Sequence, residues 1–407
     1  MQISNVTHRL TVASIWSVLL FSFVSLSASA LSHILIFIPA VYGLILQLKK
    51  QDQKIPLSMY SIFILIFVSC VSVLVAPDIE NKLSQMFKLK YFALGALAVF
   101  PYRKAFKKIK KEHVRLMINT FLIILAIGNI AGIHALFDGY HILRMKEASD
   151  SHRAAGMYGM AITYGYGIEY IVIIAMSVGL NYWSKLDRIL NKKIFVISAI
   201  TCVLGFYFSF ARGAVVAFVL SIPFVFLMTK RKYFKVLLVG GFVLLLGLTY
   251  IVFNVDDIPG GNRLLLSAKT ESNMIRISQY ETVWKAFLEK PFTGWGFRNF
   301  EHNVYHLKTK YNIAYPEFMS HAHNNYLEFL AGTGIFGFIS FTLFIIFWFY
   351  EVYRRRDDIS VIFLPFIVSL AVSGLFQNTI TDGENMFVIM FIYALTQAYP
   401  RDKKVFA

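Results

Sequence analysis

Long apolar runs separated by short polar or basic segments are the main feature of this 407-residue chain. A membrane-spanning helix needs about 20 mainly apolar residues, and runs near that length recur along the whole sequence. They lie near residues 11–30, 31–48, 56–76, 90–102, 114–137, 158–182, 194–211, 213–229, 235–253, 326–350, 359–376 and 386–399. The pattern predicts an all-α polytopic membrane protein with about twelve transmembrane helices.

One long polar interval covers residues 254–325, which is too long for a simple connection and too polar for a membrane. A helix is predicted inside it over about 273–289, and Pro291 ends that run. The apolar residues of this helix form one face at helical spacing: Ile275, Val283, Trp284, Phe287 and Leu288. The chain therefore divides into transmembrane helices one to nine (1–253), a large helical loop (254–325) and transmembrane helices ten to twelve (326–407).

Basic residues gather in the short segments on one side of the predicted spans. More than half of the 40 Lys and Arg residues lie there: Arg9; Lys49, Lys50 and Lys54; Arg103, Lys104, Lys107, Lys108, Lys110, Lys111 and Arg115; Lys185, Arg188, Lys192 and Lys193; Lys230, Arg231, Lys232 and Lys235; Arg354, Arg355 and Arg356; Arg401, Lys403 and Lys404. Short loops that are rich in Lys and Arg face the cytoplasm. This rule places both termini in the cytoplasm and the long loop on the outer side.

Composition supports the membrane class and argues against other classes. Charged residues make up 15% of the chain, against about 25% in soluble domains. The net charge of +17 would suit nucleic-acid binding, but the distribution of the cations among short loops indicates topology instead. Cys70 and Cys202 both lie in apolar runs, so neither a disulfide framework nor a thiolate metal site is predicted. The first apolar run leads straight into the second, so it is interpreted as a helix and not as a cleaved signal peptide.

The long loop returns to the membrane through Ser320-His321-Ala322-His323-Asn324-Asn325. A histidine at the mouth of a membrane helix can titrate near neutral pH and act as a general base. His323 is the candidate base, Asn324 is expected to orient it, and His321 is expected to point elsewhere. A simpler reading is that one histidine caps the helix and the other is solvated. The two histidines could also ligate a metal, but nearby acids are few and no cysteine joins them, so no metal is expected.

Glycines follow the histidines at positions 332, 334 and 337. In membrane helices such small residues usually let a neighbouring helix approach closely. We therefore expect these glycines, Gly334 and Gly337 included, to fix the mouth of the helix.

Three arginines on the outer side are candidates for binding an anion. Arg212 interrupts a long uncharged stretch, and an arginine at membrane depth costs several kcal/mol without an anionic partner. Its alternative role is to snorkel and mark a turn. Arg276 lies on the predicted loop helix, and Arg153 lies in Arg153-Ala154-Ala155-Gly156 just before the sixth span. Either of these two, taken alone, would be an ordinary surface charge.

These residues together resemble a known family. The string His323-Asn324, nine residues, Gly334, two residues, Gly337 resembles the signature of the O-antigen ligase and polymerase superfamily. The order of the preceding motifs is also similar: Arg153-x-x-Gly156, then Arg212-Gly213, then Arg276…Trp284…Pro291…Gly294-Trp295-Gly296. The resemblance covers roughly residues 150–340.

The resemblance implies a membrane glycosyltransferase of the GT-C type, working without metal or cofactor on the periplasmic face of a bacterial inner membrane. The donor would be a glycan on polyprenyl (undecaprenyl) diphosphate. In the ligase, the acceptor is a sugar hydroxyl of the lipid A–core oligosaccharide, and the product is lipopolysaccharide. The partners would thus be these two lipids and the membrane, with no nucleic acid.

The residue roles that the resemblance implies also make chemical sense. A diphosphate leaving group needs fixed positive charge, and arginine binds phosphate through two parallel hydrogen bonds. Arg212 and Arg276, with Arg153 as a third, would bind the diphosphate. His323 would remove the acceptor proton in a single displacement with inversion, while Asn324, His321, Gly334 and Gly337 would support it.

Other functions stay open. A polymerase of the same superfamily would join glycan units on the same carrier, and another type of member transfers glycan to a protein side chain. A transporter or flippase is a different class. Transporters usually carry ionisable residues within several spans, whereas Glu169 is the clearest such residue here.

Overall fold

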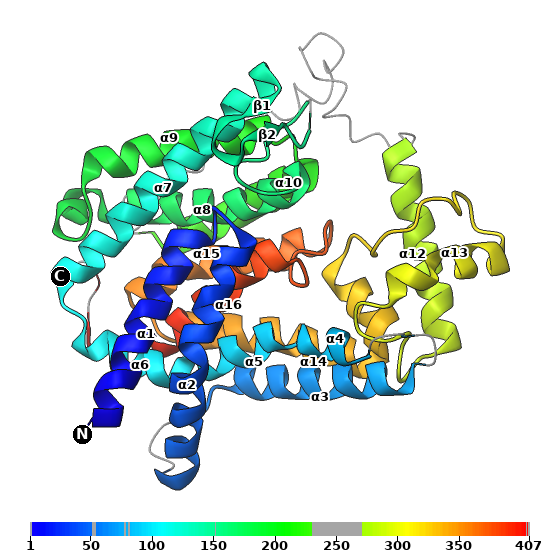
Figure 1. The fold of residues 1–407 in the computed structure, drawn as a ribbon, viewed down its shortest axis with the longest axis horizontal. Coiled ribbons are helices and arrows are strands. Elements are labelled where there is room, and N and C mark those ends of the chain that lie inside the picture. Colours follow the sequence, from blue (N-terminus) through cyan, green and yellow to red (C-terminus); the bar gives the residue numbers. More distant parts are fainter. Residues whose placement is uncertain are drawn as a thin grey trace.

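A computed structural model describes residues 2–50, 54–76, 79, 82–150, 152–229, 271–403 and 405. The predicted ninth span (235–253), the basic residues 230–235 and the first part of the long loop (254–270) lie outside the described residues. The rest forms a bundle of helices with two further helices at one end (Figure 1).

The first part of the bundle contains ten helices in the described ranges: α1 (Gln2–Phe21), α2 (Leu26–Lys50), α3 (Leu57–Val75), α4 (Lys82–Phe87), α5 (Lys90–Leu97), α6 (Val99–Lys108), α7 (Lys111–Asp138), α8 (Ala161–Tyr182), α9 (Lys192–Phe208) and α10 (Arg212–Leu227). The two end helices are α12 (Glu271–Glu289) and α13 (Phe300–Tyr311). The chain then returns through α14 (Asn325–Tyr353), α15 (Asp358–Ser373) and α16 (Gly383–Ala398).

Short elements complete the fold. Strands β1 (Tyr140–His141) and β2 (Lys146–Glu147) form an antiparallel ladder after α7, with the 3-10 helix η1 (Ile142–Arg144) between them. A second 3-10 helix, η2 (Trp183–Arg188), follows α8. The regular secondary structure of the described residues is thus helical, as predicted, apart from this small hairpin.

Five helices in the described ranges are long and apolar enough to cross a membrane: Ser27–Lys49, Leu57–Val75, Lys111–Asp138, Ala161–Arg188 and Asn325–Tyr353. Helices α10 and α15 are apolar but shorter. This agrees with a polytopic membrane protein, while the number of about twelve spans stays a prediction.

Two predicted boundaries are wrong. The first two spans meet at residues 22–25 and not at 30–31, where the Ser22 hydroxyl donates to the carbonyl of Val18 at the end of α1. The predicted fourth span (90–102) is divided between α5 and α6, and α6 runs on to Lys108. Apolar composition alone does not reveal such breaks, because apolar residues continue across each break.

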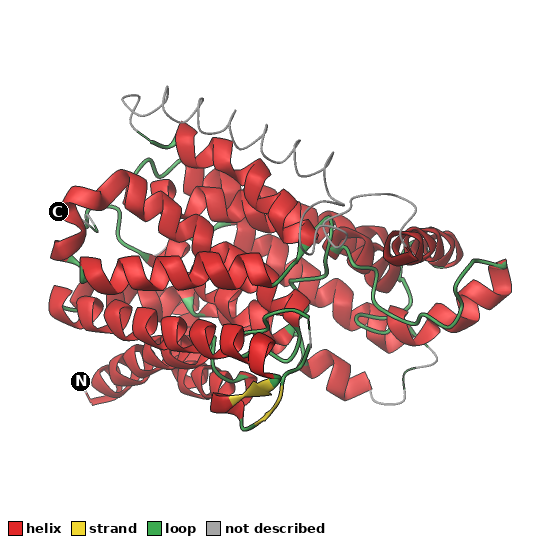
Figure 2. Ribbon diagram, turned by 90° about the horizontal axis from the view of Figure 1, so that it is seen from above, coloured by secondary structure: helices red, strands yellow, loops and turns green. Residues whose placement is uncertain are grey.

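The helices pack in a few close pairs. Helix α14 lies along α3, α10 lies against α15, and α7 lies against α9, while α16 contacts α5, α6 and α8 (Figure 1). Both chain termini lie at the end of the bundle opposite α12 and α13 (Figure 2). We call the end with the two termini the basic end, because Lys107, Lys108, Lys111 and Lys403 lie there. The opposite end, which carries α12 and α13, is called the loop end.

Candidate active site

Two asparagines attach the start of α14 to the connection between α15 and α16. Asn324 caps α14, because its side-chain oxygen accepts hydrogen bonds from the backbone N–H groups of Tyr326 and Leu327. The side-chain oxygen of Asn325 accepts from the backbone N–H groups of Thr379 and Ile380. Residues 374–382 are therefore held beside the histidines, although they lie some fifty positions further along the chain.

His323 is held in one orientation by this connection. Its Nδ1 lies 2.8 Å from the side-chain oxygen of Gln377, and its Nε2 lies 3.3 Å from the hydroxyl of Ser320. Since an amide oxygen only accepts, Nδ1 carries the proton of the neutral ring and Nε2 carries the lone pair. The Ser320 hydroxyl has a second acceptor in the His321 carbonyl at 3.2 Å, so Nε2 can take a proton. The residue that orients His323 is thus Gln377, and the expectation for Asn324 is corrected: its amide serves as a helix cap.

His321 lies against His323, contrary to the expectation that it points elsewhere. The two ring centroids are 4.3 Å apart at an interplanar angle of 69°, and His321 Nδ1 accepts a hydrogen bond from the backbone N–H of His323. The cause is the backbone of His323, which has a φ of +49° and turns the chain back on itself. A non-glycine residue held in this region is strained, and such strain is frequent at functional sites.

Burial keeps both histidines neutral. It lowers the pKa of His321 to about 3, with the charge of His323 as the second cause. Burial also lowers the pKa of His323, and the positive charge of Arg276 lowers it further, while the hydrogen bond to Gln377 opposes the shift. A neutral His323 whose Nε2 carries a lone pair has the form that a general base needs.

The three predicted arginines form one electrostatic group beside the histidines. The charges of Arg276 and Arg153 both act on the guanidinium of Arg212, and Arg276 also acts on His321 and His323. The only carboxylate in ion-pair range of Arg153 among the described residues is Asp150, at 3.9 Å. Like charges gathered in this way repel one another, and an anion bound among them would relieve the repulsion.

Each arginine comes from a different element. Arg212 is the first residue of α10 and follows a tight turn in which Phe210 has a φ of +48°. Arg276 is half-buried on α12. The segment after Arg153 is fixed to the end of α9 by a 2.9 Å hydrogen bond from the Ala154 N–H to the Phe208 carbonyl. The position of Arg153 is therefore set by a backbone contact with a distant part of the chain, and that of Arg212 by a local turn.

A family model for O-antigen ligase matches residues 197–342 of this chain. This match, over about a third of the chain, supports membership of the O-antigen ligase/polymerase superfamily. The match runs from within α9 into α14 and includes Arg212, Arg276 and both histidines, whereas Arg153 lies before it. Members of this superfamily are membrane enzymes of the glycosyltransferase kind, and no curated protein matches the chain.

The glycines after the histidines pack against a loop and not against a neighbouring helix. Helix α14 is broken at Gly334, which has a φ of +68°. The freed backbone groups bond to residues 291–296: the N–H of Ile335 donates to the Pro291 carbonyl, and the N–H of Gly296 donates to the Gly332 carbonyl. A Cβ at Gly334 would lie 2.6 Å from the backbone of Phe292, so only glycine fits there. Gly337 faces Thr333 of its own helix.

The predicted apolar face of α12 is only partly correct. Val283 is buried, but Trp284 and Leu288 are 54% and 56% exposed. The side that packs inward is largely polar: Ser278, Gln279, Thr282, Val283 and Ala286. The reason is that this side holds the histidine segment, since the Gln279 amide donates to the Ser320 hydroxyl and to the Phe318 carbonyl.

Two site residues were not predicted from the sequence. Arg298 has a φ of +58°, donates to the Thr381 carbonyl, and places its charge close enough to act on His321 and Asp382. It stands two residues after the Gly294-Trp295-Gly296 string, so extending that motif would have found it. Gln377 gave no local signal, because its role depends on the contact between α14 and a distant connection.

The described residues contain no group of three or more His, Cys, Asp and Glu side chains that could hold a metal ion. Glu328, which follows the histidines in the chain, instead accepts a 2.9 Å hydrogen bond from the backbone N–H of Ala322. The site is thus one of arginines, histidines and amides.

Proposed function

We propose that this protein is an O-antigen ligase, which transfers a glycan from polyprenyl (undecaprenyl) diphosphate to a sugar hydroxyl of the lipid A–core oligosaccharide. The observation that carries the proposal is the position of Arg276, whose charge acts on Arg212 on one side and on His323 on the other. Arg276 therefore lies near both a cationic group that suits a diphosphate and a neutral histidine that suits an acceptor hydroxyl.

In the proposed reaction, the acceptor oxygen attacks the anomeric carbon of the first donor sugar. The bond from that carbon to the diphosphate oxygen breaks, and polyprenyl diphosphate leaves with the electron pair. Arg212 and Arg276, with Arg153, stabilise the charge that builds up on the leaving oxygens. This group needs no proton to leave, so the arginines replace an acid catalyst.

His323 removes the acceptor proton during the attack. Its Nε2 takes the proton while Nδ1–H stays bonded to Gln377, which stabilises the imidazolium that forms. Base and leaving group lie on opposite sides of the reacting carbon, so we expect inversion. Asn324, His321, Gly334 and Gly337 act by fixing the segment that carries His323.

The membrane arrangement forms part of the proposal. We infer a multi-pass protein of the bacterial inner membrane, of GT-C type, with both termini in the cytoplasm. The common location of the two termini at the basic end supports this, as does the clustering of Lys and Arg in short loops. The loop end, with α12 and α13, then faces the periplasm.

The test is a transfer assay with purified protein, a defined glycan on undecaprenyl diphosphate, and purified lipid A–core. We expect glycan on the lipid A–core, and a gene deletion that removes all polymer-bearing lipopolysaccharide while lipid-linked polymer accumulates. A deletion that leaves core with a single glycan unit would instead indicate a polymerase. No transfer to any acceptor, with intact donor binding, would argue against a ligase.

A further inference from the structure

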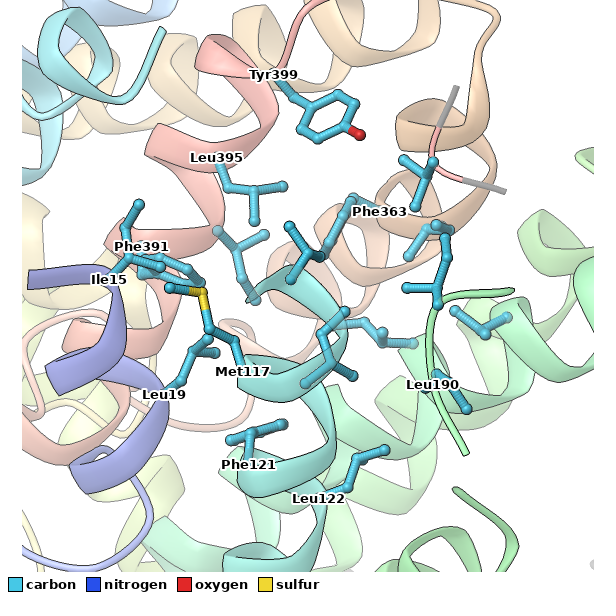
Figure 3. A pocket seen from close by; sticks show the side chains of 18 of the residues that line it. Ile15, Leu19, Met117, Phe121, Leu122, Leu190, Phe363, Phe391, Leu395 and Tyr399 are labelled. Atoms are coloured by element: carbon cyan, nitrogen blue, oxygen red, sulfur yellow. The ribbon is translucent and has the colours of Figure 1, made fainter. Parts of the chain in front are cut away.

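A second feature lies far from the arginines: an apolar cavity of about 300 Å³ inside the bundle. Side chains of α1, α7, α15 and α16 point into it, among them Leu19, Met117, Phe363 and Phe391, and Leu190 closes the side near α9 (Figure 3). Almost every lining residue is apolar. The cavity therefore suits a hydrocarbon and not a sugar or a phosphate.

The cavity is separate from the candidate active site. It is lined by the first half of α7, from Lys111 to Leu122, whereas the segment with Arg153 follows the opposite end of that helix. Helix α7 has 28 residues and is thus about 42 Å long. Likewise, α15 lines the cavity with Ile359 and Phe363, while its far end leads to Gln377. The cavity reaches the basic end at Lys111 and Lys403 and extends along the bundle as far as Ser22 and Phe23 after α1.

The volume indicates the size of the occupant. An engineered apolar cavity of about 150 Å³ binds benzene, so one of twice that volume takes a chain of roughly a dozen carbons. If the cavity were empty, its lining would lose dispersion contacts over a large area. One fatty acyl chain matches both the size and the chemistry.

Two lysines complete the binding site at the basic end. Lys111 and Lys403 are the only charged residues of the described chain that line the cavity. The Lys403 ammonium is fixed there, because it donates to the carbonyls of Phe106 (2.9 Å) and Ile109 (3.2 Å). An ammonium has three donors, so these bonds leave it able to bind a phosphate oxygen. The nearby acid Asp358 is engaged with Tyr182 and with the backbone N–H of Val405.

We propose that this cavity binds one acyl chain of an anionic phospholipid from the leaflet at the basic end, with the lipid phosphate at Lys111 and Lys403. The polyprenyl tail of the donor is the rival occupant. A donor bound with its diphosphate at Arg212 would have its head group at the loop end, so the lysines would then face no phosphate. The lysines therefore favour the phospholipid, which acts as a structural lipid and takes no part in the transfer.

The first test is quantification of the lipid that stays bound to the full-length protein after extensive washing in mild detergent, by mass spectrometry. We expect one tightly retained phospholipid with an anionic head group, such as phosphatidylglycerol. Retention of a polyprenyl lipid in its place, or of no lipid, would overturn the proposal.

The second test compares variants in the same measurement. Ala175→Phe places a ring in the cavity and should abolish retention. The matched control is Val203→Phe, because Val203 is 52% exposed on α9 and its substitution leaves the cavity unchanged. Equal retention in both variants would contradict the proposal.

The lysines provide a test that does not depend on how Ala175→Phe folds. Lys111→Gln and Lys403→Gln should each weaken binding of phosphatidylglycerol about fivefold, since a cation near an anionic lipid contributes about 1 kcal/mol. Lys104→Gln, at an exposed position on α6, is the control and should have no effect. An equal loss in all three variants, or in none, would show that the lysines do not form the head-group site.

Discussion

His323 and Arg276 lie in one site, but the chain holds them in opposite ways. His323 is fixed by hydrogen bonds on both ring nitrogens and by a strained backbone. Arg276 makes no hydrogen bond or ion pair with another described residue, and its charge acts on the like charge of Arg212. The proposed base is thus oriented in advance, whereas Arg276 contributes positive charge without such a fixed contact among the described residues. A preorganised base and a group of fixed positive charges are what a displacement from an anionic leaving group requires.

This difference predicts different kinetic effects. Loss of the base should affect the chemical step and leave donor binding intact. Loss of an arginine should affect both, because the diphosphate is charged before the reaction and gains charge during it. The following predictions test that division, from the largest expected effect to the smallest.

The largest effect is expected for His323→Ala. General-base catalysis contributes typically 10²–10⁴-fold, so kcat should fall by about that factor while the KM for the donor stays unchanged. His321→Ala should have a smaller effect, since His321 supports the backbone of His323 and removes no proton. If His323→Ala kept more than about a tenth of the normal kcat, His323 would be a positioning residue and not the general base.

Arg276→Ala and Arg212→Ala should each lower kcat/KM by about 10²-fold, with a higher KM for the donor. Lysine at either position should restore only part of the rate, because it offers a point charge where arginine offers a planar fork. Lys285→Ala, on the same helix as Arg276, is the matched control and should behave as the native enzyme. Full activity of Arg212→Lys would favour a structural role for that arginine.

Gln377→Leu should have an intermediate effect, because it removes the acceptor that keeps the proton on Nδ1 of His323. A hydrogen bond of this kind contributes about 1 kcal/mol, so kcat should fall about fivefold. The KM for the donor should not change. If Gln377→Leu changed only KM, the amide would be part of the donor site and would not orient the base.

The pH dependence should shift in variants that change the charge around His323. Because burial and the charge of Arg276 lower the pKa of His323, activity should fall with decreasing pH only below the ordinary histidine value of about 6.5. Removing the positive charge in Arg276→Ala should raise that pKa and move the ascending limb of the kcat/KM profile to higher pH. Gln377→Glu should move it in the same direction, since a carboxylate favours the imidazolium. A limb that stays in place in both variants would exclude His323 as the titrating group.

The smallest effect is expected for metal removal. If arginines balance the charge of the diphosphate, transfer should continue at the normal rate in excess EDTA. Loss of activity that a single divalent cation restores would show that a metal takes over the role assigned to Arg212 and Arg276.

Local patterns in the sequence revealed the elements of this fold and several site residues. Apolar runs marked α3, α7, α8 and α14, and an isolated charge in an apolar stretch marked Arg212. Helix α13 was missed although its signal was present: Phe300, Val304 and Leu307 repeat at helical spacing and are fully buried. These features depend on residues close together in the chain, so they can be predicted from one sequence.

The remaining features depend on contacts between distant segments. Gln377 meets His323 only because Asn325 fixes the connection between α15 and α16 to α14. The glycine at 334 showed that something approaches α14, but not that it is the backbone after Pro291. Left-handed backbone at His323 and Arg298 is likewise imposed by tertiary structure on residue types that do not favour it.

The most direct test of the division between base and cations is the affinity for undecaprenyl diphosphate, measured by calorimetry with the native protein, His323→Ala and Arg276→Ala. We expect His323→Ala to bind as tightly as the native protein. Arg276→Ala should bind at least about tenfold more weakly, because one charge-assisted contact with phosphate contributes about 1.5–3 kcal/mol. Equal weakening in both variants, or tight binding by Arg276→Ala, would contradict the assignment of diphosphate binding to the arginines and proton removal to the histidine.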